Sequence, residues 1–260
     1  MKLEGKIAII TGGSRGIGLG CARVFGRHGG TVVIASHDDV EGREAEAQLS
    51  SAGINAMFQH CDVRVEADIR NLINVTVDRF GRLDCILNNA GWHPPAATID
   101  QIDLEAFQSL LQLNLTSTFL GCKYAVEHLK KTRGNIIIMS SAVALMGQAG
   151  AASYVATKAG QIGLTRSLAI DLARDGVRVN AVCPAGVRTP LVEEWAQSEY
   201  SPEEALRKVD YWHPLGRMAT AEEIGEVCAF LASHEASFIT GQVISADGGA
   251  GLGYAEKFDG

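Results

Sequence analysis

Short runs of apolar and β-branched residues alternate along this chain with longer segments of helical period. The runs are apolar almost throughout, as expected for parallel strands buried on both faces of a sheet. They span residues 6–10, 31–35, 55–59, 84–87, 135–139, 177–182 and 242–245. The helical segments span approximately 17–29, 41–52, 66–79, 103–130, 153–174 and 221–232. This alternation predicts an α/β fold, a doubly wound parallel sheet of about seven strands with helices on both faces.

The length and charge of the chain limit its architecture and partners. It has 260 residues, of which 47% are apolar, so we expect a single domain over residues 1–260. The net charge of −7 argues against nucleic acid as a partner, because no basic stripe offsets phosphate repulsion. We find neither the roughly 18 apolar residues that a membrane span needs nor a signal peptide. We therefore expect a cytoplasmic protein with no membrane partner.

The cysteines are spread singly along the chain. None belongs to a CxxC pair or to a Cys/His spacing of the kind that binds zinc. We interpret them as small buried hydrophobic residues in a reducing compartment, and we expect no metal site. They are Cys21, Cys61, Cys85, Cys122, Cys183 and Cys228.

An interval without a predicted strand lies between residues 184 and 219. An insertion after the carboxyl end of a strand is where a doubly wound sheet keeps a substrate lid. We therefore predict a lid over about 184–219, and an inert surface excursion is the alternative. The interval contains Trp195, Tyr200, Tyr211, Trp212, Pro184, Pro190, Pro202 and Pro214.

A glycine-rich loop, Thr11 to Gly18, follows the first predicted strand and leads into the first helix. Its glycines permit a tight turn, a close approach by a pyrophosphate and close packing of the helix on the strand. The helix N-terminus directs free N–H groups and a partial positive charge toward the phosphates. A structural turn is the alternative, but this context favours dinucleotide binding in a Rossmann-like domain. The residues expected at the cofactor are Gly12, Ser14, Arg15, Gly16, Ile17 and Gly18.

Together with this loop, three further motifs resemble the short-chain dehydrogenase/reductase family: Asn88-Asn89-Ala90-Gly91, Ser141 and Tyr154-x-x-x-Lys158. The resemblance runs from about residue 5 to 249 and implies a nicotinamide-dependent oxidoreductase of alcohols and ketones. It implies that the Asn motif steadies the sheet beside the adenosine; a simple strand-ending turn is the alternative. The cofactor contacts implied here are Asn89, Ala90, Gly91, Asp62 and Val63.

The end of the second strand bears on the choice between NAD and NADP. A carboxylate at this tip would bind the adenosine ribose and repel a 2′-phosphate, but the chain has Ser36 there. Ser36 can donate to a phosphate, and Arg15 and protonated His37 add positive charge. Asp38 and Asp39 act in the opposite direction. The balance leans slightly to NADP(H), with NAD(H) left open.

Tyr154 and Lys158 are four residues apart on a predicted helix, so both project from one face. A free tyrosine has a pKa of about 10, which is too high for efficient proton transfer near neutrality. A lysine ammonium one turn away favours the phenolate. In the family, this lysine also holds the nicotinamide ribose.

The resemblance implies two further catalytic residues. Ser141, 13 residues before Tyr154, would hydrogen-bond the substrate oxygen; Ser140 is its neighbouring alternative. Asn114 matches the family position that holds a water in the proton relay. The implied reaction moves a hydride between the nicotinamide and a carbonyl carbon while Tyr154 exchanges a proton with the oxygen, and it requires no metal.

The stretch from Pro184 to Thr189 resembles the family segment that receives the nicotinamide carboxamide. The resemblance implies cofactor contacts by Pro184, Val187 and Thr189. Most family members have glycine directly after the proline, whereas this chain has Ala185. The extra methyl group would shift the loop slightly.

Residues 88–95, 154–158, 189–194 and 248–254 resemble one subgroup, 17β-hydroxysteroid dehydrogenase type 14, which is also associated with L-fucose dehydrogenase activity. The resemblance implies that Tyr254 reaches the site of a neighbouring subunit. The substrate residues that it implies are His93, Ser141, Gln148, Tyr154 and Arg188.

The substrate expected is a small alcohol or ketone. Arg188 and Val192 stand where the steroid-active relative has bulky aromatics, and each buried aromatic would contribute roughly 2–3 kcal/mol. Polar side chains at the pocket can instead pair with sugar hydroxyls; solvated lid residues are the alternative. We rank a sugar or polyol first, a steroid or other hydrophobic alcohol second, and a 3-oxoacyl thioester third.

The helices predicted at 103–130 and 153–174 are apolar over more than one face, so each needs a surface besides its own sheet. Family members pair these helices in dimers and tetramers, and we expect a homodimer or homotetramer. The rival hypothesis is a non-catalytic dinucleotide-binding sensor on the same fold. The complete set of Asn114, Ser141, Tyr154 and Lys158 favours an enzyme.

Overall fold

The computed structural model describes residues 1–253 of the chain. Its central sheet contains seven parallel strands within that range, in the order β3-β2-β1-β4-β5-β6-β9. This confirms the predicted α/β fold, and every strand boundary lies within about two residues of the expected one. The strands are β1 (Ile7–Thr11), β2 (Thr31–Ser36), β3 (Ala56–His60), β4 (Cys85–Asn88), β5 (Asn135–Met139), β6 (Arg178–Pro184) and β9 (Val243–Ala246).

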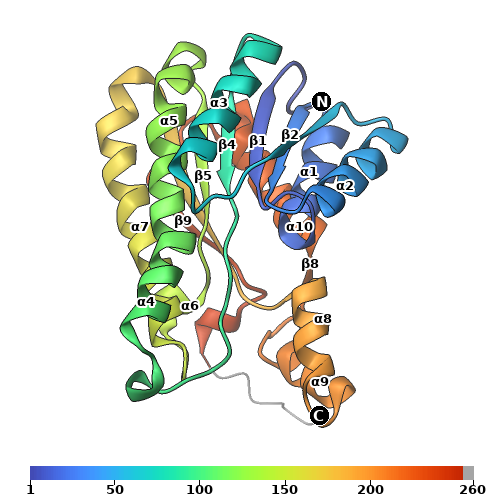
Figure 1. Cartoon of the computed structure of the whole chain (residues 1–260), viewed down its shortest axis with the longest axis vertical. Helices are drawn as coiled ribbons and strands as arrows, with labels where there is room; N and C mark the ends of the chain where they lie inside the picture. The colour runs from blue at the N-terminus through green and yellow to red at the C-terminus, as the bar shows by residue number, and fades with distance from the viewer. Residues whose placement is uncertain (254–260) are drawn as a thin grey trace.

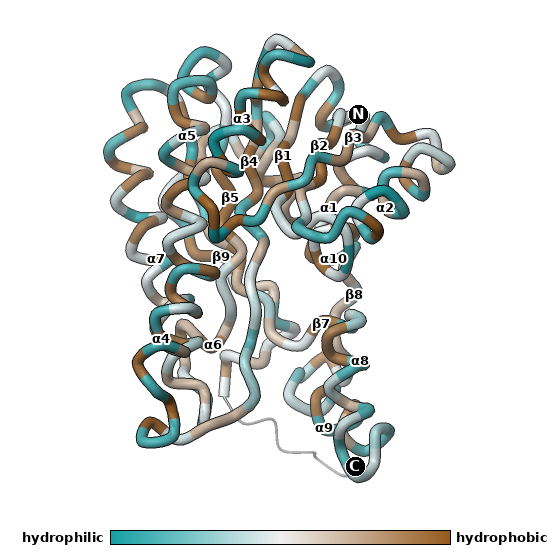
Figure 2. Tube along the Cα trace, in the orientation of Figure 1, coloured by the Kyte–Doolittle hydropathy of each residue, from teal (hydrophilic) through white to brown (hydrophobic). Residues whose placement is uncertain are grey.

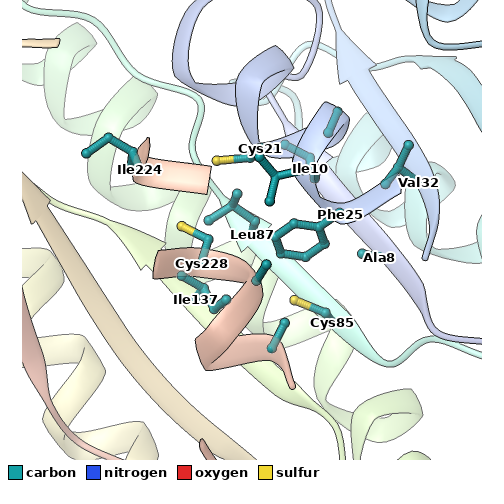
Figure 3. Packing of buried hydrophobic residues seen from close by; sticks show 14 of the residues in the cluster. Ala8, Ile10, Cys21, Phe25, Val32, Cys85, Leu87, Ile137, Ile224 and Cys228 are labelled. Carbon is teal, nitrogen blue, oxygen red and sulfur yellow. The ribbon is translucent and has the colours of Figure 1, made fainter. Parts of the chain in front are cut away.

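Each face of the sheet has its own apolar core. Neighbouring residues of a strand point to opposite faces, so Ile10 packs with helices α1, α2 and α10 while Ile9 packs with α3, α5 and α7. Figure 3 shows the first core, where Phe25 lies among strand residues. The hydrophobic colour along β1 and β4 in Figure 2 follows from burial on both faces. These helices are α1 (Gly16–Arg27), α2 (Asp39–Ser51), α3 (Glu66–Phe80), α5 (Ser117–Thr132), α7 (Ala152–Leu172) and α10 (Ala221–Ala232).

The helix expected over 103–130 differs from the prediction in its interior. It consists of α4 (Leu104–Leu111), a π-helical turn (Gln112–Thr116) and α5, which follow one another without a break. A π-turn inserts one residue into the helical repeat and changes the carbonyl pairing, and such turns are frequent at functional sites. Asn114 lies in this turn and is fully buried.

The predicted lid interval contains a strand, which corrects the expectation that it has none. β7 (Val187–Arg188) pairs in parallel with β8 (Ala219–Thr220), apart from the main sheet. A two-residue strand is too short to produce a periodic apolar pattern. Two helices, α8 (Pro190–Gln197) and α9 (Pro202–Tyr211), lie between these strands. Figure 1 shows both helices on the same end of the molecule as α4 and α6 (Val143–Met146).

All six cysteines are buried and free, as predicted. Within residues 1–253, no helix has both the length and the apolar character that crossing a membrane requires. The remaining short elements are 3₁₀ turns: η1 (Ile99–Gln101), η3 (Ala173–Asp175), η4 (His234–Ala236) and η5 (Ala250–Leu252).

Candidate active site

A cleft of about 450 Å³ lies at the carboxyl ends of the central strands. This is the edge where doubly wound sheets bind ligands. Most of the predicted cofactor residues line it, although they come from six separate segments of the chain. Those residues are Gly12, Ser14, Arg15, Gly16, Ile17, Ser36, His37, Asp62, Val63, Asn89, Ala90, Gly91, Tyr154, Lys158 and Thr189.

The other predicted residues lie behind or beside this lining. Gly18 packs beneath the loop, where an added Cβ would come within 2.0 Å of the Gly12 carbonyl oxygen. Close packing of the helix on the strand therefore explains this glycine. The cleft lining includes His93 but none of Gly18, Asn114, Ser141, Gln148, Pro184, Val187 and Arg188 within the described range.

The glycine loop forms a cradle suited to an anion. Gly12 and Gly16 have φ values of 62° and 54°, a region that glycine adopts without strain. Arg15, the N-cap of α1, makes no side-chain capping bond, and the first turn of α1 carries no acidic residue. Neither the N-cap nor the first turn of α1 therefore supplies a carboxylate that would bind the first N–H groups of the helix. These N–H groups can bind the pyrophosphate of a dinucleotide instead.

Asn89 fixes this loop to the end of β4. Its amide Nδ2 donates to the main-chain oxygens of Thr11 at 2.9 Å and of Gly12 at 3.2 Å. The hydroxyl of Thr11 accepts from the main-chain N–H groups of Asn89 and Ala90, both at 3.0 Å. The Asn motif is therefore more than a strand-ending turn in this structure, since it holds the cradle in place.

The acidic residues after β2 do not act as the sequence indicated. Asp38 caps α2 by accepting from the N–H of Val40 at 2.9 Å, and Asp39 pairs with His60 at 3.0 Å. Neither lines the cleft. Besides Asp62, the acid that lines the cleft is Glu41 among the described residues, and sequence analysis missed it because only the helix geometry of α2 directs it inward.

Glu41 contacts the residues expected to receive a 2′-phosphate. Its carboxylate accepts from Ser14 Oγ at 3.4 Å and lies 3.5 Å from Arg15 Nη1. Ser14 Oγ also lies within hydrogen-bond distance of Ser36 Oγ, at 3.1 Å. Arg15 reaches a second carboxylate, Glu194 of α8, at 3.5 Å. This corner of the cleft therefore contains groups that can donate to a phosphate and two carboxylates that oppose one.

Asp62 lines the cleft and already has a partner. Arg64 Nη2 is 2.6 Å from its Oδ2, and Arg64 Nε donates to Oδ1 at 2.9 Å. These bonds hold the pKa of Asp62 below its ordinary value. Val63 beside it is buried and offers an apolar surface to a flat ring.

Tyr154 projects from the first turns of α7 into the cleft. Burial raises its pKa from 10.0 to about 12, and an interaction with Ser141 acts in the opposite direction. Lys158 Nζ lies 5.6 Å from the centroid of the phenol ring. The sequence indicated that this ammonium lowers the pKa of Tyr154, but in the structure burial is the largest influence on that pKa, and it raises it.

Lys158 is almost fully buried, with 4% of its surface exposed. Its ammonium donates to the main-chain oxygen of Met139 at 2.8 Å. In the described part of the chain this is its one hydrogen bond, so two N–H groups remain for a ligand in the cleft. Burial lowers the pKa of Lys158 from 10.5 to about 8.

The two adjacent serines have different surroundings. Ser140 Oγ donates to the main-chain oxygen of Lys158 at 2.9 Å, which ties β5 to α7. Ser141 Oγ accepts from the N–H of Val143 at 3.4 Å and acts on the pKa of Tyr154. Ser140 lines the cleft and Ser141 does not, but the Ser140 hydroxyl donates to the Lys158 carbonyl, whereas Ser141 is the serine that acts on Tyr154.

Asn114 hydrogen-bonds both to the segment after β4 and to helix α7. Its Oδ1 accepts from the N–H of Trp92 at 2.9 Å, and its Nδ2 donates to the Trp92 carbonyl at 3.0 Å. Nδ2 also donates to Thr157 Oγ1 at 3.2 Å. Sequence analysis missed Thr157, although it lies in a buried polar stripe of α7 that repeats every four residues: Ser153, Thr157, Gln161 and Thr165.

On the substrate side, the structure brings His93 and Gln148 together beside Tyr154. His93 Nε2 lies 3.2 Å from Gln148 Oε1. Arg188 is exposed on β7 and does not line the cleft. Tyr254 lies outside the described residues.

A buried histidine anchors the lid and was also missed. His213 Nε2 accepts from the N–H of Gly186 at 3.0 Å, and its Nδ1 lies 2.8 Å from the main-chain oxygen of Val209. The histidine thus joins the end of α9 to the loop that begins at Pro184. The sequence carries no signal of this contact, because 27 residues separate Gly186 from His213.

Comparisons with known proteins indicate the family of this chain. A protein-family profile described as Enoyl-(Acyl carrier protein) reductase matches residues 12–251. L-fucose dehydrogenase of Bos taurus is 45% identical over 256 residues, which cover 98% of this chain and 93% of that protein. Among solved structures, actinorhodin polyketide ketoreductase with NADPH has a TM-score of 0.90 and 33% identity, covering 95% and 97% of the two chains. Aldohexose dehydrogenase of Thermoplasma acidophilum has a TM-score of 0.90 and 30% identity, covering 99% and 98%.

Proposed function

The chain belongs to the short-chain dehydrogenase/reductase family, and we propose that it oxidises a sugar or polyol with NADP(H), using Tyr154 for proton transfer. It is an NAD(P)-dependent oxidoreductase acting on a sugar or another alcohol. One observation carries the assignment of the site: Tyr154 and Lys158 line the same cleft as the glycine loop. A phenol and a buried ammonium beside a dinucleotide cradle match the needs of hydride transfer.

The site residues divide the work of the reaction. The nicotinamide, when bound, supplies the acceptor or donor of the hydride. Tyr154 Oη takes the proton of the substrate hydroxyl during oxidation and returns it during reduction. Ser141 Oγ donates to the same substrate oxygen and so favours the charge that develops on it. The two remaining N–H groups of Lys158 hold the ribose, and its positive charge offsets part of the burial penalty on the Tyr154 phenolate.

The proposed preference for NADP(H) depends on the corner at the end of β2. Ser14 and Ser36 present hydroxyls there, and Arg15 supplies positive charge. Glu41 opposes a phosphate, but its contact with Arg15 is an exposed ion pair at 3.5 Å. Such pairs contribute little, about 0–1 kcal/mol, so Arg15 can exchange the carboxylate for a phosphate.

A sugar or polyol is the proposed substrate class. The paired His93 and Gln148 offer polar atoms beside Tyr154, which suits a substrate with several hydroxyls. The similarity to L-fucose dehydrogenase supports the same class. Trp92 and Leu191 also line the cleft and provide apolar surface, which keeps a hydrophobic alcohol as the second candidate.

We further propose a homodimer or homotetramer that forms through α5 and α7. Phe119 on α5 is 49% exposed, and Ile170 on α7 is 78% exposed. A groove of about 230 Å³ between the two helices is lined by apolar residues that include Phe119, Val126 and Leu168. An exposed apolar surface of this kind gains from being covered by a second copy. The six buried free thiols suit a cytoplasmic location, which we also propose.

A crossed activity screen tests the proposed function. Purified protein is assayed for hydride transfer with NAD and with NADP, each against sugars, steroids and acetoacetyl thioesters. We expect turnover of a sugar, with a higher kcat/KM for NADP than for NAD. Much more efficient turnover of steroids would contradict the substrate assignment. Dinucleotide binding without turnover of any alcohol would instead favour a non-catalytic sensor.

A further inference from the structure

The segment from Pro184 to Thr189 joins two chemically different parts of the site. The main-chain oxygen of Pro184 accepts from the N–H of Ala142 at 2.8 Å, directly after Ser141. Thr189 lines the cleft, and its side chain lies 3.6 Å from where a Cβ at Gly16 would stand. The segment therefore runs from the proposed catalytic serine to the glycine loop. The nicotinamide of a dinucleotide held by that loop would lie along it.

Gly186, in the middle of this segment, is bound to the lid through both of its main-chain polar groups. Its N–H donates to His213 Nε2 at 3.0 Å, and its carbonyl accepts from the N–H of Ala219 at 3.1 Å. A Cβ added at Gly186 would lie 2.7 Å from both His213 Cε1 and Val209 Cγ1, which is too close for unstrained packing. A glycine at this position, one residue after Ala185, therefore lets the histidine ring pack against the main chain.

His213 is buried, with 3% of its surface exposed, and its partners select one tautomer of the ring. The Val209 carbonyl can only accept, so Nδ1, 2.8 Å away, carries the proton. The N–H of Gly186 can only donate, so Nε2 is the acceptor. An aliphatic side chain would fill the same space but could not accept from Gly186, so packing alone does not explain the histidine.

We infer that His213 is a positioning residue for the nicotinamide end of the cofactor: through Gly186 it fixes the segment from Pro184 to Thr189 against the ring. The inference rests on the proposed function, since it concerns the dinucleotide that the cleft is proposed to bind. His213 does not line the cleft, so it acts through Gly186. The residues proposed for the adenosine end follow β2 and β3, toward the opposite edge of the sheet from β6, and do not depend on this contact.

Two substitutions of the histidine separate the contact with Gly186 from the contact with the lid. His213→Asn keeps a donor for the Val209 carbonyl, but its side chain is too short to accept from Gly186. His213→Gln places an acceptor oxygen at the length of Nε2. Calorimetry measures Kd for NADP and NAD, and for the same two molecules without the nicotinamide, 2′-phospho-ADP-ribose and ADP-ribose.

The loss of affinity should be confined to ligands that carry the nicotinamide. For His213→Asn we expect Kd of the intact dinucleotides to rise about five-fold to ten-fold, with Kd of both ring-free ligands within about two-fold of the wild type. We also expect kcat for hydride transfer to fall about ten-fold, because the ring is less well placed. His213→Gln should keep the Kd of the intact dinucleotides within about two-fold of the wild type.

Ser233→Ala is the matched control, since Ser233 is also 3% exposed and lies near the start of β6, away from the cleft. It removes a buried side-chain bond to the Phe230 carbonyl, at 2.7 Å. This variant should lower the unfolding temperature without changing the Kd of any ligand. Gly186→Ala displaces the segment from the other side and should weaken the intact dinucleotides alone. It takes the place of His213→Asn if that protein does not fold.

The inference is overturned if folded His213→Asn binds the intact dinucleotide as the wild type does, or if it loses affinity for the ring-free ligand to the same degree. It is also overturned if His213→Gln binds as weakly as His213→Asn, or if Ser233→Ala selectively weakens the intact dinucleotide. A wild-type protein that binds dinucleotides but transfers no hydride would instead refute the proposed function, and the binding comparison would still decide the role of His213.

Discussion

The imidazole ring of His93 lies against the phenol ring of Tyr154, with the ring centroids 4.2 Å apart and the planes inclined by 47°. The histidine is held at both nitrogens: Nδ1 lies 2.7 Å from the Pro94 carbonyl and Nε2 lies 3.2 Å from Gln148 Oε1. The wall of the site beside the proton-transfer oxygen is therefore a fixed polar ring. This arrangement lets substitutions at His93 separate ring contact from hydrogen bonding.

Substitution of His93 should weaken substrate binding more than cofactor binding. Both His93→Ala and His93→Phe remove the ring nitrogens, and with them the contact that holds Gln148 at the proposed sugar site, while His93→Phe keeps a ring against Tyr154. We expect both variants to raise KM for the sugar about ten-fold and to leave KM for the dinucleotide within about two-fold. Steady-state kinetics with each substrate varied in turn measures this. A wild-type KM in His93→Phe would show that the ring contact, and not the polar atoms, holds the substrate.

Removal of the Glu41 charge should improve NADP binding. In Glu41→Gln, Arg15 loses one of its two carboxylate partners and the repulsion of a 2′-phosphate decreases. We expect KM for NADP to fall about five-fold, with a smaller change for NAD. Asp39→Asn is the control, because Asp39 pairs with His60 outside the cleft and should leave the NADP/NAD ratio unchanged. A selective loss of NAD affinity in Glu41→Gln would mean that Glu41 binds the ribose hydroxyls.

The pH dependence of the free energy of unfolding of the cofactor-free protein should show that Lys158 has a lowered pKa. Its pKa falls from 10.5 to about 8 because burial disfavours the ammonium. Below pH 8 the buried side chain is charged, and this charge destabilises the folded protein. Between pH 8 and 10.5 Lys158 is neutral in the folded protein but still protonated in the unfolded chain, so the free energy of unfolding of the wild type increases as pH rises. Lys158→Met has no such titration. Across this window we expect the stability of Lys158→Met relative to the wild type to decline by about 3 kcal/mol.

Denaturant unfolding of both proteins, at pH values well below 8 and well above 10.5, measures this difference. Groups that the two proteins share cancel in the comparison. Lys158→Met should also lose hydride transfer while it remains folded. A stability difference that stays constant with pH would contradict the lowered pKa of Lys158.

A charge placed on the exposed apolar face of α5 should disrupt the proposed oligomer. Phe119→Asp introduces a carboxylate next to the groove between α5 and α7. We expect its mass, measured by gel filtration with light scattering, to fall to that of a smaller assembly or a monomer. Val40→Asp is the control, since Val40 is 68% exposed on α2, away from this face. A wild-type protein that is already monomeric would contradict the proposal.

The sheet could be predicted from the sequence because its strands are buried on both faces. Adjacent residues such as Ile9 and Ile10 enter different cores, so the run is apolar throughout and is recognisable. The π-turn at Asn114 and the two-residue strand β7 could not be predicted. Each changes the chain over too few residues to alter a periodic pattern.

The candidate site was predictable where motifs repeat a known spacing, and less so where helix packing decides which side chains meet. The glycine loop and the pair Tyr154 and Lys158 line one cleft, as the motifs indicated. Glu41 was missed because an acid on the first turn of α2 has no fixed direction before the helix is placed. Thr157 could have been found, since its four-residue spacing from Ser153 and from Gln161 places all three on one helix face.

The most direct test of the account is the rate of hydride transfer in Tyr154→Phe. This rate is measured at saturating dinucleotide from the change in absorbance of the reduced nicotinamide. The variant keeps the ring against His93 and loses the oxygen that moves the proton. We expect kcat to fall by at least about a hundred-fold, with dinucleotide affinity within about two-fold of the wild type. A Tyr154→Phe protein that retains the wild-type kcat would contradict the account.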